Sequence, residues 1–114
     1  FVGDGPLKTK AKKLGLVTGI VKDIQPYLIQ ADAVFCSSYL TIWKALAYKR
    51  QIFCLYQNPL KFDYLNDFPA RKYLHLVGSA EELISQLDQV LPPCPSIPDW
   101  KSASQLYLNL WQKK

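Results

Sequence analysis

Residues 17–67 read VTGIVKDIQPYLIQADAVFCSSYLTIWKALAYKRQIFCLYQNPLKFDYLND, and this stretch decides the fold. The apolar runs Ala33–Cys36 and Gln51–Tyr56 predict buried strands, and Tyr39–Tyr48 between them predicts a helix. Short strands that alternate with helices require crossover connections and hence a mostly parallel sheet. The sequence therefore predicts an α/β fold, an open parallel sheet with helices on both faces.

The flanking segments extend this alternation. Upstream we expect a strand end at Phe1–Val2, a turn at Gly3–Pro6, a helix over Leu7–Leu14 and a strand over Leu16–Ile20. A helix over Lys22–Gln30 should follow; it is interrupted near Pro26 and turns Tyr27 and Leu28 inward. Downstream we expect a short helix within Lys61–Asp67, an edge strand over Tyr73–Val77, and a helix that begins at the capping box Ser79–Glu82. The apolar residues of that last helix fall on one stripe: Leu83, Ile84, Leu87, Val90 and Leu91.

The composition divides the chain into three parts. Residues 1–91 form the expected domain, whose N-terminal strand is incomplete, and residues 92–98 form a stiff Pro-rich connector. Residues 99–114 form an amphipathic helix with Trp100 and Trp111 on one face. That face could pack on this same domain or dock onto a missing upstream domain, and the sequence leaves both alternatives open.

The bulk composition is that of an ordinary globular protein, with 49% hydrophobic and 20% charged residues among 114. The first residue is Phe1 rather than Met, so we expect the chain to be the later part of a longer protein. No apolar run approaches the ~18 residues that a membrane span needs. Cys36, Cys54 and Cys94 lack metal-ligand spacing, so we expect reduced thiols in the cytoplasm and no metal cofactor.

The net charge of +5 is concentrated near the start, at Lys8, Lys10, Lys12 and Lys13. On a helix these lysines spread around most of the circumference, which indicates a solvated surface. The alternative is attraction to an acidic substrate or to anionic lipid, which would place the protein peripherally at the inner membrane surface. Aromatic residues do not alternate with the basic ones, so we expect no nucleic-acid partner.

Polar residues at the ends of two predicted strands are the candidates for phosphate binding. Ser37, Ser38 and Thr41 lie where a strand passes into a helix, and the unpaired amides and positive dipole of a helix start attract a diphosphate. Ser38 could instead simply cap the helix. Gly3 and Gly5 form a second loop that permits close approach of a ligand, although a tight turn alone explains it equally well.

Several motifs in order resemble the C-terminal, donor-binding domain of B-type glycosyltransferases. They are Gly3-Asp4-Gly5-Pro6, then Val17-Thr18-Gly19-Ile20-Val21-Lys22-Asp23-Ile24, then Tyr27-Leu28 followed by Ala31-Asp32, then a strand, serine and helix. The resemblance is to the peptidoglycan UDP-N-acetylglucosamine transferase type and to group-1 glycosyltransferases. It covers residues 1–67 by motif and the rest by topology. It implies one half of a two-domain fold with Rossmann-like halves.

The resemblance also implies roles for particular residues. It places the backbone of Val21 against the nucleotide base, and Ser37, Ser38 and Thr41 on the diphosphate. Lys44 stands where the family has a glutamate that grips the ribose, and residues 57–63 where a loop reaches the donor sugar. An ammonium has no acceptor, so Lys44 cannot reproduce the glutamate contact, although it could pair with a phosphate. In the sugar loop, Asp63-Tyr64 replaces the family's Gln-Gln pair.

The function implied is transfer of a sugar from a nucleoside diphosphate, UDP above all, to an acceptor hydroxyl in glycan biosynthesis, with a lipid-linked acceptor as one option. We expect an inverting-type enzyme whose base comes from the missing N-terminal domain or subunit, so that this chain alone is inactive and carries no catalytic residue we can name. One alternative is a non-catalytic split subunit or degenerate paralogue that binds a partner. Another is a nucleotide-sugar epimerase built on a similar sheet.

Overall fold

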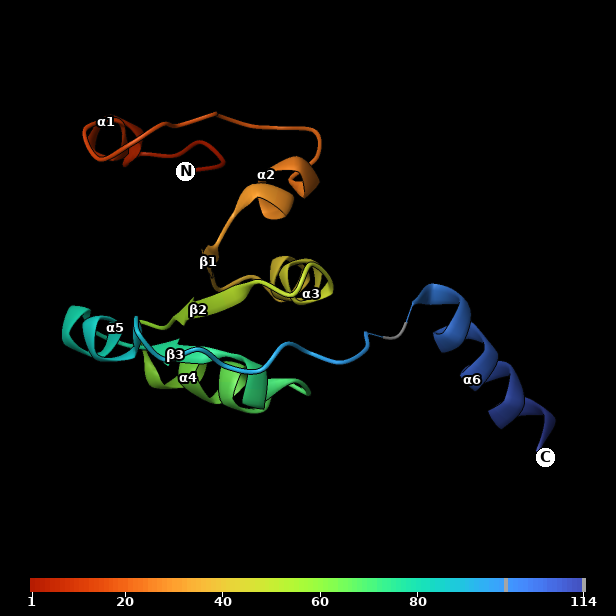
Figure 1. Ribbon diagram of the computed structural model, residues 1–114. Coiled ribbons are helices and arrows are strands. Elements are labelled where there is room, and N and C mark those ends of the chain that lie inside the picture. Colours follow the sequence, from red (N-terminus) through yellow and green to blue (C-terminus); the bar gives the residue numbers. More distant parts are fainter. Residues whose placement is uncertain (98, 114) are drawn as a thin grey trace. The chain divides into compact units, whose positions relative to one another are not determined.

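A computed structural model of the chain describes residues 1–97 and 99–113 (Figure 1). The chain forms two compact units, Phe1–Ala31 and Asp32–Lys114. The second unit contains the sheet. Its elements run in the order β1 (Ala33–Cys36), α3 (Tyr39–Ala47), β2 (Gln51–Leu55), α4 (Pro59–Asn66), the 3₁₀ turn η1 (Arg71–Tyr73), β3 (His75–Val77), α5 (Ala80–Gln86) and α6 (Trp100–Gln112).

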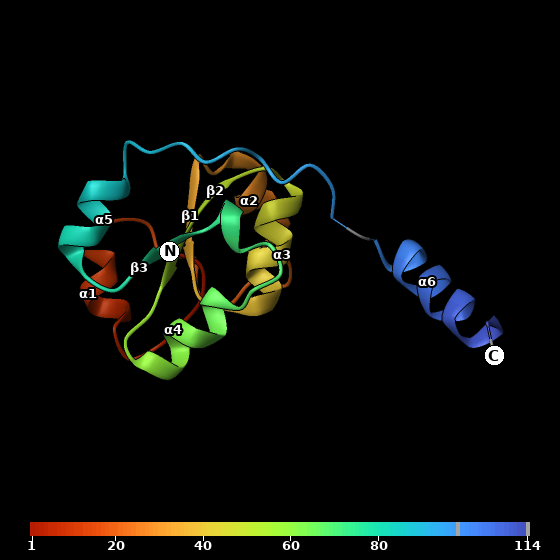
Figure 2. The same ribbon diagram turned by 90° about the horizontal axis from the view of Figure 1, so that it is seen from below.

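The three strands form one open parallel sheet in the order β1-β2-β3 (Figure 1), and Figure 2 shows the same elements from below. Helix α3 packs on β1 and β2, while α4 and α5 contact β3. The predicted α/β class, with parallel strands joined by helical crossovers, is therefore confirmed for this unit. The prediction of an edge strand after residue 73 is also confirmed, although β3 is shorter because Arg71–Tyr73 forms a 3₁₀ turn.

The register of the sheet places ring side chains in one row across the strands and two cysteines in the next. Phe35, Phe53 and His75 are neighbours across the three strands, with ring centroids 5.1 Å apart for the two phenylalanines and 4.4 Å for Phe53 and His75. In the next row Cys36 is paired with Cys54, and Cys54 with Leu76. Because successive residues of a strand point to opposite faces, the ring row and the cysteine row lie on different faces of the sheet.

Helix α3 forms because its apolar residues fall on one face. Ile42, Ala45 and Leu46 follow helical spacing and are buried, with Ile42 fully so. The helix ends in a Schellman motif, in which the Arg50 amide donates to the Ala45 carbonyl and the Lys49 amide donates to the Leu46 carbonyl. Lys49 therefore adopts a left-handed conformation with φ of 56°, a geometry that usually requires glycine.

We expect the substitution Lys49→Gly to stabilise the second unit by about 1 kcal/mol, since it removes the steric cost of a left-handed Cβ. Chemical denaturation followed by circular dichroism measures this as a higher midpoint. The matched control is Lys44→Gly in the interior of the same helix, which should cost about 1 kcal/mol instead. Equal effects of the two changes would contradict the strain at position 49.

Helices α4 and α5 each begin with a side-chain cap. The Asn58 side chain accepts from the Lys61 amide at 2.8 Å, and the Ser79 hydroxyl accepts from the Glu82 amide at 3.1 Å. The predicted start of α5 is thus confirmed. Its predicted extent was wrong, because the helix ends at Gln86 and the apolar stripe is not buried: Ile84 is 69% and Val90 81% exposed. Gln51 instead holds the Leu91 backbone by two hydrogen bonds, which turns the chain away from a helical path.

Several predictions in the first unit were also wrong. The expected strands at Phe1–Val2 and Leu16–Ile20 are absent from this described segment, which has only an antiparallel bridge between Gly3 and Gly19. Both glycines have positive φ, 126° and 77°, which interrupts an extended ladder. The helices here are short, α1 (Lys8–Lys12) and α2 (Gln25–Gln30), and Pro26 lies in the first turn of α2 rather than interrupting it. Leu28 is buried as expected, whereas Tyr27 is exposed.

The C-terminal helix α6 begins as predicted, with the Asp99 carboxylate accepting from the Ser102 amide at 2.7 Å. None of its described residues is buried, and Trp100 is 91% and Trp111 73% exposed. The two alternatives for what this apolar face contacts therefore both stay open.

His75 is the one charged or polar residue among the described residues that the core buries, with 2% of its surface exposed. Its Nε2 lies 3.2 Å from Gln51 Oε1 and its Nδ1 lies 3.3 Å from Gln86 Oε1. Burial lowers the pKa of His75 below 6.5, and the positive charge of Arg71 lowers it further, although the contact with Gln86 opposes this. The folded chain therefore holds a proton on this ring less tightly than the unfolded chain does.

We expect the free energy of unfolding to fall as the pH drops below 6.5, because protons then bind preferentially to the unfolded His75. At about pH 7.5 and above the ring is neutral in both states and contributes little pH dependence. Urea titrations at about pH 7.5 and about pH 5.5 measure the loss. A His75→Gln variant should show a smaller difference between the two pH values, and an unchanged difference would contradict the role of His75.

Candidate functional site

The carboxyl ends of the three strands lead into three short loops at one edge of the sheet. β1 is followed by Ser37 and Ser38, β2 by residues 56–58, and β3 by Gly78 and Ser79. The carboxyl edge is where open parallel sheets bind their ligands. The predicted site residues of this unit therefore lie at the edge where the fold class places a site.

The start of α3 brings Ser37, Ser38 and Thr41 together as predicted. Ser38 is the N-cap residue, but its side chain makes no capping hydrogen bond in the described structure. The structure therefore does not support the interpretation that the Ser38 side chain simply caps this helix. The first-turn amides of α3 have no capping side chain, and they carry the positive end of the helix dipole.

A positive side chain contacts the residue that precedes the N-cap of α3. Lys61, in the first turns of α4, donates from Nζ to the Ser37 carbonyl at 2.6 Å, and its ammonium lies 4.7 Å from the centre of the Tyr64 ring. This contact joins the loop after β1 to the helix after β2. Lys61 was not singled out by the sequence analysis, although it falls within residues 57–63, which the family resemblance assigns to sugar contact.

A hollow of about 490 Å³ adjoins the loops after β2 and β3. Residues that line it are Tyr56, Gln57, Asn58, Pro59, Phe62 and Gly78. The Tyr56 ring covers Gly78 so closely that a Cβ at position 78 would lie 2.5 Å from the ring. Only glycine therefore leaves the Tyr56 ring in this position.

Glu82 supplies a carboxylate at the same edge. Its Oε2 accepts from the Gly78 amide at 2.7 Å and from the Tyr56 hydroxyl at 3.4 Å. Burial and the charge of Glu82 raise the pKa of Tyr56, so the phenol is a neutral donor at physiological pH. From the sequence, Glu82 was predicted only as part of a capping box. Its position depends on contacts of the start of α5 with Tyr56, which follows β2, and these contacts have no local signal.

Lys44 lies further along α3 and is exposed. It is five residues after the first helical residue, so it stands about 7.5 Å along the axis from the start of α3. The structure therefore brings Lys61, rather than Lys44, to the helix start.

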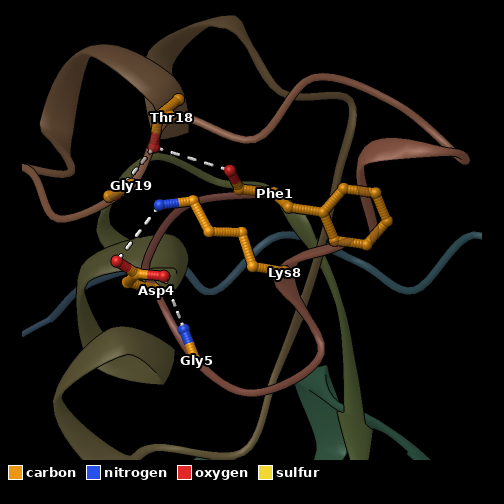
Figure 3. A network of polar contacts seen from close by, with 6 residues as sticks. All are labelled: Phe1, Asp4, Gly5, Lys8, Thr18 and Gly19. Carbon is orange, nitrogen blue, oxygen red and sulfur yellow. Dashed lines mark hydrogen bonds and ion pairs between the residues drawn. The ribbon is translucent and has the colours of Figure 1, made fainter. Parts of the chain in front are cut away.

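The remaining predicted residues belong to the first unit. Gly3, Gly5 and the half-buried Val21 are described there, and Gly3 and Gly5 line a hollow of about 330 Å³. Figure 3 shows the contacts of Asp4 with Gly5 and Lys8, and those of Thr18 with Phe1 and Gly19. The Gly3 amide donates to the Gly19 carbonyl at 2.9 Å, and the Gly5 amide donates to the Asp4 carboxylate at 2.9 Å. Both glycine amides are therefore already engaged, that of Gly3 in the bridge to Gly19 and that of Gly5 within the turn.

Asp4 is stabilised as an anion in this turn. The hydrogen bond from Lys8, at 3.2 Å, lowers the pKa of Asp4, and the Gly5 amide lowers it further. A carboxylate in this position disfavours a second anion nearby. The tight-turn interpretation of Gly3–Pro6 thus explains the contacts seen, and a phosphate there would have to displace them.

No group of three or more His, Cys, Asp or Glu side chains in residues 1–97 and 99–113 could hold a metal ion. None of the helices in that part of the chain is both long enough and apolar enough to cross a membrane. Comparison of the chain with protein-family models, curated proteins and solved structures finds no match.

Proposed function

We propose that this chain is the donor-binding part of a B-type glycosyltransferase and that it binds a nucleoside-diphosphate sugar, UDP-linked above all. The observation that carries the proposal is the start of α3 at the carboxyl edge of the parallel sheet: its N-cap residue Ser38 makes no side-chain capping hydrogen bond, and the Lys61 ammonium contacts the carbonyl of the preceding residue, Ser37. A helix start with unpaired amides and an adjacent cation is chemically suited to a diphosphate.

The proposed roles follow from this geometry. The amides of Leu40 and Thr41, the Ser38 hydroxyl and the Lys61 ammonium hold the diphosphate. When the bond to the sugar breaks, negative charge develops on the leaving diphosphate, and these groups stabilise it electrostatically. The base that activates the acceptor hydroxyl comes from the other half of the two-domain fold, in the same cytoplasmic enzyme.

The hollow beside Tyr56 is the proposed place for the donor's sugar or ribose. Tyr56 offers an aromatic face, and the Glu82 carboxylate offers an acceptor for hydroxyl hydrogens. In this proposal Glu82 supplies the acceptor that the family resemblance would expect at position 44, where this chain has a lysine.

Calorimetric titration of the chain with UDP, uridine and inorganic pyrophosphate tests the proposal. We expect UDP to bind at least about tenfold more tightly than uridine, a difference of about 1.4 kcal/mol that the diphosphate supplies. Pyrophosphate should compete with UDP. Equal affinity for UDP and uridine, or no binding of either, would contradict a diphosphate site.

A second candidate is a non-catalytic subunit of the same fold that binds a protein partner. The exposed apolar face of α6, with Trp100 and Trp111, favours it. The substitution Lys44→Glu separates the candidates. Stronger UDP binding would indicate a lapsed donor site and hence this second candidate, whereas unchanged or weaker binding would favour a site that works with a lysine at position 44.

A further inference from the structure

Two cysteines are direct neighbours in the sheet. Cys36 ends β1, and its partner across the parallel ladder is Cys54 of β2. Parallel strands lie about 4.8 Å apart, and paired residues point to the same face. A disulfide needs Cα atoms about 4.4–6.8 Å apart, so this pair meets the requirement without movement of the strands.

The two thiols differ in access and in acidity. Cys54 is fully buried, while Cys36 is half-buried and adjoins the exposed loop at Ser38. The hydrogen bond from the Cys54 thiol lowers the pKa of Cys36; burial opposes this, and the positive charge of Lys61 adds to it. The same hydrogen bond, together with burial, raises the pKa of Cys54. Because Cys36 is the more accessible of the two thiols, it is the nucleophile of the pair, and the buried Cys54 is the resolving thiol.

We propose that Cys36 and Cys54 form a redox-responsive dithiol that a peroxide converts into a disulfide between β1 and β2. The Cys36 thiolate attacks one peroxide oxygen; the S–O bond forms, the O–O bond breaks and hydroxide leaves. The Cys54 thiol then gives up its proton, and its sulfur attacks the Cys36 sulfur. The S–S bond forms, the S–O bond breaks, and the second oxygen leaves as water. Overall, two thiols and one hydrogen peroxide give one disulfide and two waters.

The third cysteine provides an internal comparison. Cys94 is buried and its sulfur contacts the Ser96 carbonyl at 3.6 Å, and no partner cysteine faces it among the described residues. In the folded chain the oxidation should therefore be selective for the pair in the sheet.

Peptide mapping of the intact chain after treatment with hydrogen peroxide tests the proposal. We expect the tryptic peptides 23–44 and 51–61 to be joined, with the loss of two hydrogen atoms, and dithiothreitol to separate them again. A Cys94→Ser variant should give the same linked pair. Oxidation in guanidinium should instead mix all three cysteines, which shows that the selectivity depends on the fold. Circular dichroism before and after oxidation confirms that the chain is folded.

A Cys54→Ser variant tests the order of events. In this variant we expect Cys36 to be trapped as a sulfenic acid by dimedone, since no neighbouring thiol resolves it. The proposal is overturned if peroxide leaves Cys36 and Cys54 unlinked in the folded wild-type chain, or if the links formed there are as mixed as those in guanidinium.

Discussion

An Ile42→Ala variant should lose about 2–5 kcal/mol of stability, a large fraction of the roughly 5–15 kcal/mol that is typical of folded proteins. Ile42 is 0% exposed and lies on the face of α3 that packs on β1 and β2. Its truncation removes buried methyl groups and leaves a cavity between helix and sheet. Because the sheet that α3 packs on has three strands in the described part of the chain, few other contacts can offset the loss.

Leu40→Ala is the matched control for this change. Leu40 belongs to the same helix but is 61% exposed, so its truncation should change stability by less than about 0.5 kcal/mol. Urea denaturation followed by circular dichroism measures both variants. Similar losses in the two would mean that α3 does not pack on the sheet through the face described.

A Lys61→Glu variant should lose at least about tenfold in affinity for UDP, or roughly 1.4 kcal/mol. The ammonium of Lys61 lies at the start of α3, 2.6 Å from the Ser37 carbonyl. A carboxylate there would repel a diphosphate instead of attracting it, and it could not donate to the carbonyl.

Lys72→Glu offers a control of the same charge change. Lys72 also has its ammonium near a tyrosine ring, 5.1 Å from the centre of Tyr73, but it precedes β3 and so belongs to the amino edge of the sheet. We expect calorimetry to show little change in UDP affinity for this variant. An equal loss in both variants would mean that overall charge, rather than a site at α3, determines binding.

The central part of the fold could be predicted because its signals are local. The apolar runs that became β1 and β2 are short and bounded by polar residues, and α3 between them has its buried residues at helical spacing. The caps at Ser79 and Asp99 depend on residues only three positions apart. Such patterns predict an element from its own sequence, and here they gave the order of strands and helices of the second unit.

The parts that were mispredicted depend on contacts or backbone angles that the pattern does not encode. The residues expected as a strand at Leu16–Ile20 include Gly19, whose positive φ ends any extended run. The helix from Ser79 was expected to continue to Leu91, but the Leu91 backbone is held by Gln51, forty residues earlier. Neither feature can be deduced from hydrophobic periodicity.

The candidate site likewise has residues that local sequence predicts and residues that only distant contacts bring together. Ser37, Ser38 and Thr41 could be placed together because a strand-to-helix junction is a local feature. The approach of Lys61 to Ser37 and that of Glu82 to Tyr56 join residues 24 and 26 positions apart, and both require the parallel register of the sheet. The pairing of Cys36 with Cys54 is set by that same register.

The most direct test of a donor site at the start of α3 is an amide-resolved NMR titration of this chain with UDP, with GDP and ADP as comparisons. We expect shifts that are largest at Ser38–Thr41 and Lys61, and stronger for UDP than for the other two nucleotides. The same experiment reports whether Gly3, Gly5 and Val21 also respond. Absence of shifts at millimolar UDP, or shifts confined to Lys8–Lys13, would contradict a donor site at the start of α3.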